Sequence, residues 1–245
     1  MEDIGNKISV VTICYNCRID MEQTVNSVVA QTYANVEYII VDGGSTDGTL
    51  AMMDKYRERI TTFISERDDG IYDALNKGVR AATGEWIICM NAGDAFAKPT
   101  TLADVFAQQI ADDTTVLYSD FLLCNADGTR TLRQTDRRKG EIHHQNIIYR
   151  RRLHETFGYY VVTHPYIVSD LLFFLAIPPE QFLKLPTPIA LVKAGGVSDG
   201  QWCAEQAWAA KMIYGMDTIP GIFKKYLYAH AHLLLKRLLS KFRRP

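Results

Sequence analysis

The sequence has little of what marks a disulfide-rich, fibrous or membrane-spanning protein. Its five cysteines are an odd number at irregular spacing, and neither its 16 glycines nor its eight prolines form a repeat. The longest nearly apolar run, residues 226–235, is interrupted by two histidines and is far shorter than the roughly 20 residues that cross a bilayer. These features exclude a disulfide scaffold and a collagen-like chain, and we expect no membrane-spanning helix.

Neither sign of charge dominates the chain, but the charges are unevenly placed. The net charge of −1 combines +6 over residues 217–245, which hold seven Lys or Arg and one acid, with −7 over residues 1–216. A nucleic-acid-binding domain needs a basic face on its folded body, so we expect no nucleic-acid partner. The basic tail instead suits an anionic surface.

Cys14 and Cys17 spell C-x-x-C, the spacing of redox and metal pairs. Cys14 closes an apolar run, however, whereas a thioredoxin-type pair places its first cysteine at an exposed helix start. We therefore interpret the cysteines as buried or free thiols in a reducing cytosol, with a redox or metal pair as the alternative.

The pattern of the first half predicts an α/β fold. Short β-branched runs alternate with helical patterns, which is typical of a Rossmann-like, mostly parallel sheet flanked by helices. We expect strands at residues 8–14, 36–41, 61–65 and 85–90, and helices at residues 21–31, 49–56 and 71–82. One domain over residues 1–216 is expected, with a first half at about 1–95 and a second half at about 96–216.

The alternation breaks down in the second half. We expect a helix at residues 102–110, an extended run at 116–124 with a hairpin turn at 125–128, and a helix at 169–176. Residues 222–242 form an amphipathic pattern, with an apolar stripe made of Phe223, Leu227, Ala231, Leu234, Leu235, Leu238 and Phe242. This predicts a basic C-terminal helical tail over residues 217–245.

Polar loops follow each predicted strand of the first half. They contain Tyr15 and Asn16, then residues 42–48, 66–70 and 91–94. Ligands of an open α/β sheet bind at the carboxyl ends of its strands, so these loops converge on one rim. Carboxylates there can accept from ribose hydroxyls, and one can hold a Mg²⁺ or Mn²⁺ on a diphosphate. The plainer interpretation is that Asp42 and Asp47 cap a turn and the next helix.

Four segments at this rim resemble one known family. The segments VVTICYN, QTYANVEYIIVDGGSTDGT, ISERDDGIYDALNKG and AATGEWIICMNAGD are similar to those of family 2 glycosyltransferases with the GT-A fold. The resemblance continues more weakly to residues 195–198, so it covers roughly the first 200 residues. Within the family the chain resembles bacterial enzymes that build O-antigen, colanic-acid-like or capsular repeat units.

The resemblance implies that residues of about 1–95 are a nucleotide-sugar half with a donor pocket and that residues of about 96–216 are an acceptor half. Thr12, Tyr15 and Asp42 would hold the base and ribose, and Asp68, Asn76 and Lys77 would line the same pocket. Lys77 is equally compatible with a solvated lysine.

The resemblance also implies a metal motif at residues 91–94, where the family has two acids and this chain has Gly93 before Asp94. Asp94 is then the one carboxylate for Mn²⁺ or Mg²⁺, which suffices if diphosphate oxygens and water complete the coordination. Gly43 is a second departure, because many relatives have an Asp there that helps to read the base.

The resemblance assigns Asp170 as the catalytic base, since inversion requires a proton acceptor opposite the leaving diphosphate. A carboxylate against the apolar helix that follows is expected to have a raised pKa, which suits a base. The alternative is a helix N-cap, because Ser169 and Asp170 are both good capping residues. His144 and Gln145 are implied as acceptor contacts. Trp202 either stacks on a sugar or belongs to the core.

The tail is interpreted as a helix lying on the anionic inner face of a bacterial cytoplasmic membrane, with packing on the body or on a second copy as the alternative. The expected function is a metal-dependent transfer of a sugar with inversion, preferably from a UDP-sugar. The expected acceptor is a saccharide linked to a polyprenyl diphosphate, in the synthesis of a bacterial surface polysaccharide. A non-catalytic nucleotide-sugar-binding or assembly module is the alternative. A Rossmann dehydrogenase is disfavoured, because G-x-G-x-x-G does not follow the first strand.

Overall fold

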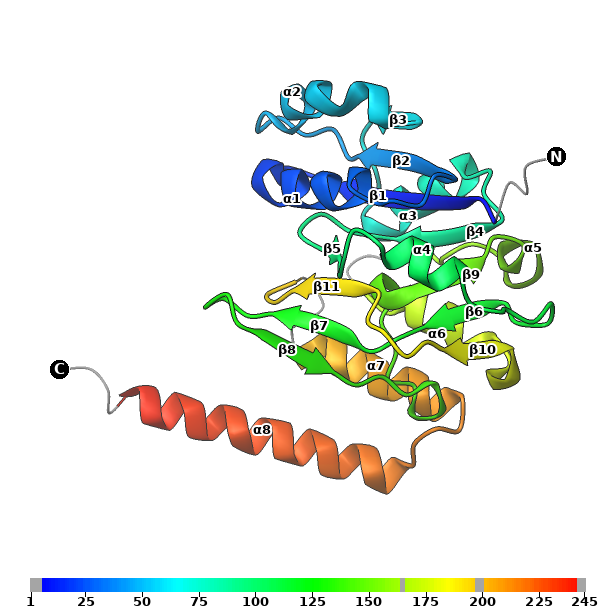
Figure 1. Ribbon diagram of the computed structural model, residues 1–245. Helices are drawn as coiled ribbons and strands as arrows, with labels where there is room; N and C mark the ends of the chain where they lie inside the picture. Colours follow the sequence, from blue (N-terminus) through cyan, green and yellow to red (C-terminus); the bar gives the residue numbers. More distant parts are fainter. Residues whose placement is uncertain (1–5, 164–165, 197–200, 242–245) are drawn as a thin grey trace.

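The computed structural model describes residues 6–163, 166–196 and 201–241, together with the side chains of those residues except residues 201–202, 229 and 232–241. Its first half alternates strands and helices as the sequence predicts (Figure 1). The elements are β1 (Ile8–Cys14), α1 (Arg18–Val29), β2 (Val36–Asp42), α2 (Thr49–Met53), the 3₁₀ helix η1 (Asp54–Arg59), β3 (Thr62–Ser65), α3 (Ile71–Ala81), β4 (Trp86–Cys89), β5 (Ala95–Phe96) and α4 (Thr101–Phe106).

The second half contains the elements that the sequence pattern predicts and further elements that it does not predict. They are β6 (Val116–Tyr118), β7 (Phe121–Cys124), β8 (Arg130–Arg133), η2 (Arg137–Lys139), η3 (His144–Asn146), β9 (Ile147–Arg150), α5 (Leu153–Phe157), α6 (Ser169–Ala176), η4 (Pro179–Gln181), β10 (Phe182–Lys184), β11 (Ala190–Lys193), α7 (Gln201–Ile213) and α8 (Ile219–Lys241).

The central sheet has seven strands in the order β10-β6-β9-β4-β1-β2-β3. Every neighbouring pair is parallel except the two pairs that include β9. All seven residues of β1 are buried, because helices cover both faces of the sheet. Side chains of α1, α2 and α4 pack on one face, and side chains of α3, α5, α6 and α7 pack on the other. The predicted α/β class is therefore confirmed.

A second, smaller sheet has the order β5-β11-β7-β8. The extended run expected at residues 116–124 divides between the two sheets, with β6 in the large one and β7 in the small one. The break falls at Ser119, which is fully buried and accepts the Ile189 amide on its hydroxyl, and at Asp120, which accepts the Thr135 amide. Buried polar groups must be paired, and these pairings turn the chain from one sheet to the other.

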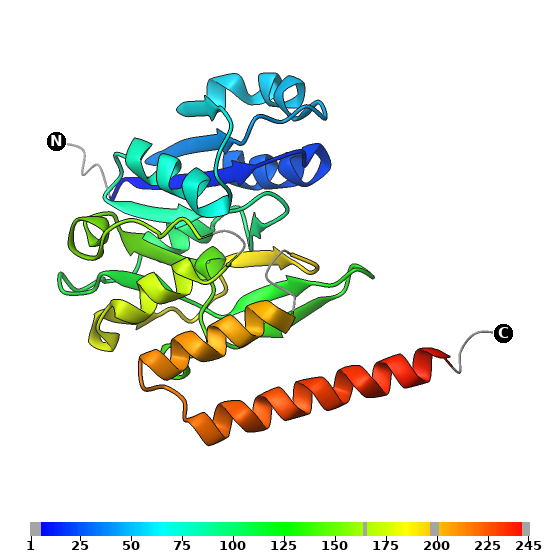
Figure 2. The ribbon, with the colours of Figure 1, turned by 180° about the vertical axis from the view of Figure 1, so that it is seen from behind.

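The C-terminal helix α8 begins three residues before the predicted start and leads away from the α/β body (Figures 1 and 2). The apolar side chains exposed on its described part are Ile219, Phe223, Tyr226, Leu227 and Tyr228. Phe242 of the predicted stripe lies outside the described residues. Within the described part of the chain, no helix combines the length and apolarity needed to cross a membrane.

Candidate active site

The parallel strands β1, β2, β3 and β4 bring their carboxyl ends to one edge of the central sheet. The predicted site residues of the first half lie near this edge: Thr12 is in β1 and Asp42 ends β2, whereas the others are in the loops that begin there or in α3, which follows β3. The structure divides them into two groups, those that support the backbone of the rim and those that face outward from it.

Asp42 belongs to the supporting group. It is fully buried, and one carboxylate oxygen, Oδ2, accepts hydrogen bonds from the Gly44 and Ser45 amides and the Ser65 hydroxyl. Burial alone would raise the pKa of Asp42, but the bonds from Ser45, Ser65 and Gly44 outweigh burial and lower it. The plainer interpretation of this loop is thus the one that the contacts favour, since Asp42 holds the turn. Direct recognition of a base by this carboxylate stays a prediction.

Thr12 and Asn76 make contacts within the fold. Thr12 is fully buried in β1, with its hydroxyl 3.2 Å from that of Tyr38. The Asn76 amide donates to the carbonyl of Tyr160 and accepts from its N–H, at 2.8 and 3.0 Å. These bonds support the fold around the rim, and the place of both residues in a donor pocket stays a prediction.

Lys77 is held by two acids of its own neighbourhood. Its ammonium lies 2.9 Å from Glu66 and 3.2 Å from Asp73, and it donates to the carbonyl of Arg67. The lysine therefore ties α3 to the loop after β3 instead of reaching freely into a pocket.

Tyr15 and Asp68 face outward, and they meet at Gly43. The Tyr15 ring is 64% exposed. A Cβ atom on Gly43 would stand 2.5 Å from Asp68 Oδ2 and 3.4 Å from Tyr15 Cδ2. A side chain at position 43 would therefore collide with Asp68 unless that carboxylate moved. Gly43 leaves an aromatic face and a carboxylate side by side at the rim, a pairing suited to a base and a ribose.

Asp94 lies in the loop after β4 and is 5% exposed. Its Oδ1 accepts the backbone amide of Lys193 at 2.9 Å. Burial raises the pKa of Asp94 to about 6, although the Lys193 amide, the charge of His144 and a hydrogen bond from Gln145 oppose the rise. The hydrogen bonds and charges around Asp94 therefore offset only part of the cost of burying its negative charge.

The residues present fit a Mg²⁺ or Mn²⁺ ion that is shared with a bound diphosphate. The Asn91 amide oxygen is buried with no hydrogen-bond partner, at the other end of the Asp94 loop. A hard divalent ion takes one or two carboxylates together with carbonyl-type oxygens, water and phosphate. The described residues contain no group of three or more His, Cys, Asp and Glu side chains that could hold an ion without further ligands, so the diphosphate would have to complete the coordination.

Asp170 stands in the first turn of α6, and two side chains hold it. The Tyr72 hydroxyl donates to Oδ1 at 2.7 Å, and His144 Nδ1 lies 2.7 Å from Oδ2. The N-cap position is occupied by Val168, so Asp170 is not the N-cap residue, although its carboxylate also accepts the Leu171 amide. Burial would raise the pKa of Asp170, but His144 and Tyr72 outweigh burial and lower the pKa to about 2. The expected raised pKa is corrected.

His144 connects Asp170 to the metal motif. Its Nδ1 faces Asp170, and its Nε2 lies 2.8 Å from the Asn91 side-chain nitrogen. With the Asn91 amide nitrogen donating, Nε2 accepts and Nδ1 carries the proton that faces Asp170, so the Asn91 oxygen stays free for a cation. Burial lowers the pKa of His144, but the negative charges of Asp170 and Asp94 outweigh burial and raise it.

Tyr72, Asp170, His144 and Asn91 therefore form one polar chain from α3 through α6 and η3 to the end of β4. Sequence reasoning missed Tyr72, although it lies within the matching segment ISERDDGIYDALNKG. A signal existed, because a tyrosine in the first turn of α3 faces the core with its hydroxyl toward the strand ends. Gln145 contacts Asp94, whereas the side chain of Trp202, in the first turn of α7, lies outside the described residues.

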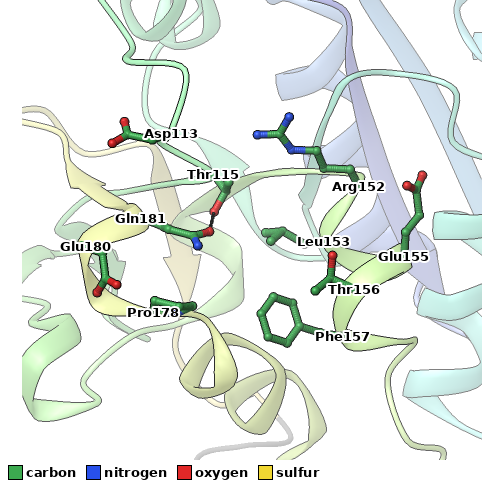
Figure 3. Close-up of a pocket in the computed structure, with 10 residues that line it drawn as sticks. All are labelled: Asp113, Thr115, Arg152, Leu153, Glu155, Thr156, Phe157, Pro178, Glu180 and Gln181. Atoms are coloured by element: carbon green, nitrogen blue, oxygen red, sulfur yellow. Dashed lines mark hydrogen bonds between the residues drawn. The ribbon is translucent and has the colours of Figure 1, made fainter.

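A cavity of about 540 Å³ lies at the opposite edge of the central sheet, where β6 and β10 begin (Figure 3). Thr115, Arg152 and Gln181 are among the residues that line it. None of the predicted site residues lines this cavity, so it is separate from the rim that carries them.

Known proteins share the fold of this chain and the sequence segments at its rim. The model of the family described as glycosyl transferase family 2 matches residues 9–168, more than half of the chain. The chain therefore belongs to glycosyl transferase family 2, as the four segments at the rim predict. The matched range contains Asp94, His144 and Tyr72 and ends two residues before Asp170.

Among curated relatives, an uncharacterised glycosyltransferase of Mycobacterium tuberculosis is 36% identical over 104 residues, which cover 42% of this chain and 38% of that protein. A PGL/p-HBAD biosynthesis glycosyltransferase of Mycobacterium bovis is 32% identical over 162 residues, 62% of each chain. The chain thus spans about two fifths to three fifths of the length of these relatives.

Solved structures share the fold at low sequence identity. S. aureus TarS 1-349 in complex with UDP-GlcNAc has a TM-score of 0.70 at 19% identity, covering 85% of this chain and 65% of that one. The mannosyltransferase PcManGT from Pyrobaculum calidifontis, in complex with GDP-Man and Mn²⁺, has a TM-score of 0.57 at 17% identity, covering 94% and 81%. These likenesses confirm the predicted GT-A fold.

Proposed function

We propose that this chain transfers a sugar, with inversion, from a nucleotide-sugar donor to a saccharide acceptor, with a UDP-sugar as the favoured donor. The observation that carries the proposal is the polar chain from Tyr72 to Asn91. It ends at the metal motif beside Asp94 and contains an ionised carboxylate, Asp170, at its other side. Bond breakage at a diphosphate and deprotonation of a hydroxyl need such groups on opposite sides of one sugar.

On the donor side, Tyr15 supplies a ring face and Asp68 a hydrogen-bond acceptor for the nucleoside. Asp94 and the Asn91 oxygen would hold Mg²⁺ or Mn²⁺ on the diphosphate. When bound, the ion stabilises the negative charge that gathers on the leaving diphosphate.

On the acceptor side, the Tyr72 and His144 bonds fix the orientation of Asp170. The low pKa of Asp170 keeps it ionised at neutral pH, so it can align an acceptor hydroxyl and face the positive charge that develops on the sugar. The hydroxyl passes its proton to the Asp170–His144 pair as it attacks. Gln145 forms a hydrogen bond with Asp94, which supports a role on the donor side beside its predicted contact with the acceptor.

The solved neighbours favour the nucleotide donor class. TarS structures contain UDP-GlcNAc or UDP, and PcManGT contains GDP-Man with Mn²⁺. A UDP-sugar remains the first choice because a tyrosine face and one carboxylate suit the small uracil ring and its ribose. A polyprenyl-diphosphate-linked acceptor in bacterial surface polysaccharide synthesis is part of the proposal.

A donor screen by thermal shift tests the function. UDP-, GDP- and dTDP-sugars are added to the parent protein and to Asp94→Ala, with Mn²⁺, Mg²⁺ or EDTA. Ligand binding raises the apparent midpoint by mass action, so one nucleotide class is expected to stabilise the parent most in the presence of metal, and Asp94→Ala to lose that gain. Absence of a shift with every donor at saturating concentration would overturn the proposal.

The tail gives the proposed enzyme a location on the inner face of the bacterial cytoplasmic membrane. Ile219, Phe223 and Leu227 expose 73%, 61% and 52% of their surfaces on α8, and Lys224 is exposed beside them. An apolar stripe flanked by cations suits an interface with anionic lipid.

Flotation with vesicles tests this location. The parent is expected to float with vesicles that contain anionic lipid and to remain behind with zwitterionic vesicles, and Phe223→Ser with Leu227→Ser to lose flotation. If the parent does not float but is a dimer that these substitutions dissociate, α8 is an interface between two copies and the membrane location is wrong.

A further inference from the structure

Lys193, the last residue of β11, stands beside the metal motif. Its backbone N–H donates to Asp94 Oδ1 at 2.9 Å, and its ammonium lies 2.5 Å from Asp20 Oδ1 in the first turn of α1. The position follows from the small sheet, where β11 pairs antiparallel with β5 and β5 begins directly after Asp94. The same residue therefore positions the carboxylate and brings a positive charge next to it.

Gly93 makes room for this lysine. Its φ of +100° lies in the left-handed region that favours glycine. A Cβ atom at position 93 would stand 3.2 Å from Lys193 Cδ and 3.7 Å from the Cβ and Cγ of Asp20. Position 93, which is the first acid in the two-acid form of the metal motif, thus has no side chain in this protein. The aliphatic part of the Lys193 side chain passes over Gly93 instead.

The ammonium of Lys193 is able to change partners. The Lys193 side chain is 51% exposed and that of Asp20 is 37% exposed. Ion pairs at such exposure contribute little stability, so a stronger anion can displace Asp20. A diphosphate carries more charge than a carboxylate, and the three N–H donors of a lysine rotate freely to meet its oxygens.

We propose that Lys193 binds the diphosphate of the donor directly, beside the cation at Asp94. The inference rests on the proposed nucleotide-sugar donor. It predicts that the loss of one acid at Gly93 is balanced by a resident amine, so that part of the affinity for a nucleoside diphosphate does not need metal. Asp20 is then a competitor that holds the ammonium when the site contains no donor.

Calorimetric titration of UDP tests the proposal with the parent, Lys193→Met, Lys193→Arg and a control, Lys184→Met. The control is matched because Lys184 also ends a strand, is 40% exposed and pairs with an acid, Asp120, at 2.7 Å, in a strand three places from β4 in the central sheet. In EDTA, Lys193→Met is expected to weaken UDP binding by about tenfold or more, the usual loss of a charge-assisted bond. The loss with Mn²⁺ is expected to be smaller, and Lys193→Arg and the control are expected to stay within about threefold of the parent.

The substitution Asp20→Asn is expected to change the affinity for UDP in the opposite direction to Lys193→Met. If Lys193 must leave Asp20 to meet the diphosphate, removal of the Asp20 charge tightens UDP binding in EDTA, whereas uridine binding stays unchanged. A merely structural ion pair would not produce this gain.

The outcomes separate the inference from the function on which it rests. Equal UDP affinity of the parent and Lys193→Met in EDTA, or weaker UDP binding by Asp20→Asn, overturns the role of Lys193 and leaves the transferase proposal standing. If the parent binds neither UDP nor GDP, with or without Mn²⁺, the nucleotide-sugar donor itself is refuted, and the inference fails with it.

Discussion

The loop after β4 and the first turn of α6 each bring one carboxylate to the site, and their surroundings differ in kind. Asp94 is buried with a backbone donor and a contact to Gln145, and burial raises its pKa to about 6. Asp170 is held by a tyrosine hydroxyl and a histidine, which lower its pKa to about 2. In the proposed function, the neighbours of the two aspartates prepare them for different tasks, because they shift the two pKa values in opposite directions.

The difference separates two tasks. A carboxylate whose charge is poorly compensated favours an incoming cation, which suits the donor side. A carboxylate whose charge is satisfied in a fixed direction suits the alignment of an acceptor hydroxyl. Environments that push the pKa values of two acids apart are how other enzymes divide such roles.

Asp170→Asn gives the largest expected effect. Loss of the proton acceptor is expected to reduce turnover by roughly 10²–10⁴-fold, whereas donor affinity changes little because Asp170 lies on the acceptor side. Turnover is measured by release of nucleoside diphosphate with acceptor present. Asp120→Asn is the control, since Asp120 is also paired with a cation but follows β6, two strands away from β4 in the central sheet. Equal losses in both variants would show that Asp170 acts through stability.

A second histidine, His154, shows how burial links a pKa to the free energy of unfolding. His154 lies among aromatic rings, donates from Nδ1 to the Gly158 carbonyl and meets the Tyr149 hydroxyl at Nε2. Burial lowers its pKa to about 4, so the folded state binds this proton less readily than the unfolded state, whose histidine pKa is about 6.5.

The stability that neutral His154 contributes is therefore full above about pH 6.5 and is lost as the pH falls toward 4, by up to about 3 kcal/mol. Urea unfolding of the parent and of His154→Gln across this range measures it. The variant is expected to lose less stability than the parent on acidification. Parallel curves would contradict the assignment.

Substitution of each acid by its amide sharpens the comparison without any substrate. In EDTA, Asp170→Asn is expected to lower the free energy of unfolding by about 1–3 kcal/mol, because an ionised acceptor of two donors is lost. Asp94→Asn is expected to leave it unchanged or raise it, because burial penalises the Asp94 charge. Urea titrations at pH 7.5 decide this, and destabilisation of equal size in both variants would remove the contrast.

Tyr72→Phe gives the smallest effect. The Tyr72 hydroxyl donates to Asp170 and accepts the Ser169 N–H at 3.0 Å, so its removal costs about 1 kcal/mol of stability and roughly a tenfold loss of turnover. The loss is expected in kcat and not in the KM for the donor. A change confined to the donor KM would assign Tyr72 to the wrong side of the site.

The first half of the fold was predictable because its signals are local. The strand at residues 8–14 and the helix near residues 71–82 are set by runs of buried apolar residues at strand and helix spacing. The second half was less predictable because its short strands depend on partners far away in the chain. β11, for example, pairs with β5, and the sequence around Lys193 contains no sign of that partner.

A family pattern marked Asp94, His144 and Asp170 in the sequence, and the roles given to them stay predictions. Residue type did indicate that Asp42 supports a turn, because its amide partners lie only two and three residues ahead. It did not reveal that Asn76 holds the backbone of Tyr160 or that the Lys193 side chain crosses over Gly93. Those two facts depend on which way a side chain points after packing, and contacts between residues 84 or 99 positions apart determine it.

The division of tasks between Asp94 and Asp170 is tested most directly by calorimetric titration of one nucleotide-sugar, with Mn²⁺ and with EDTA, into the parent, Asp94→Asn and Asp170→Asn. The account predicts that Asp170→Asn binds the donor as the parent does in both conditions, and that Asp94→Asn loses the gain in affinity that Mn²⁺ brings. If Asp170→Asn loses that gain as well, or if Asp94→Asn keeps it, the two carboxylates do not divide the donor and acceptor sides and the account is wrong.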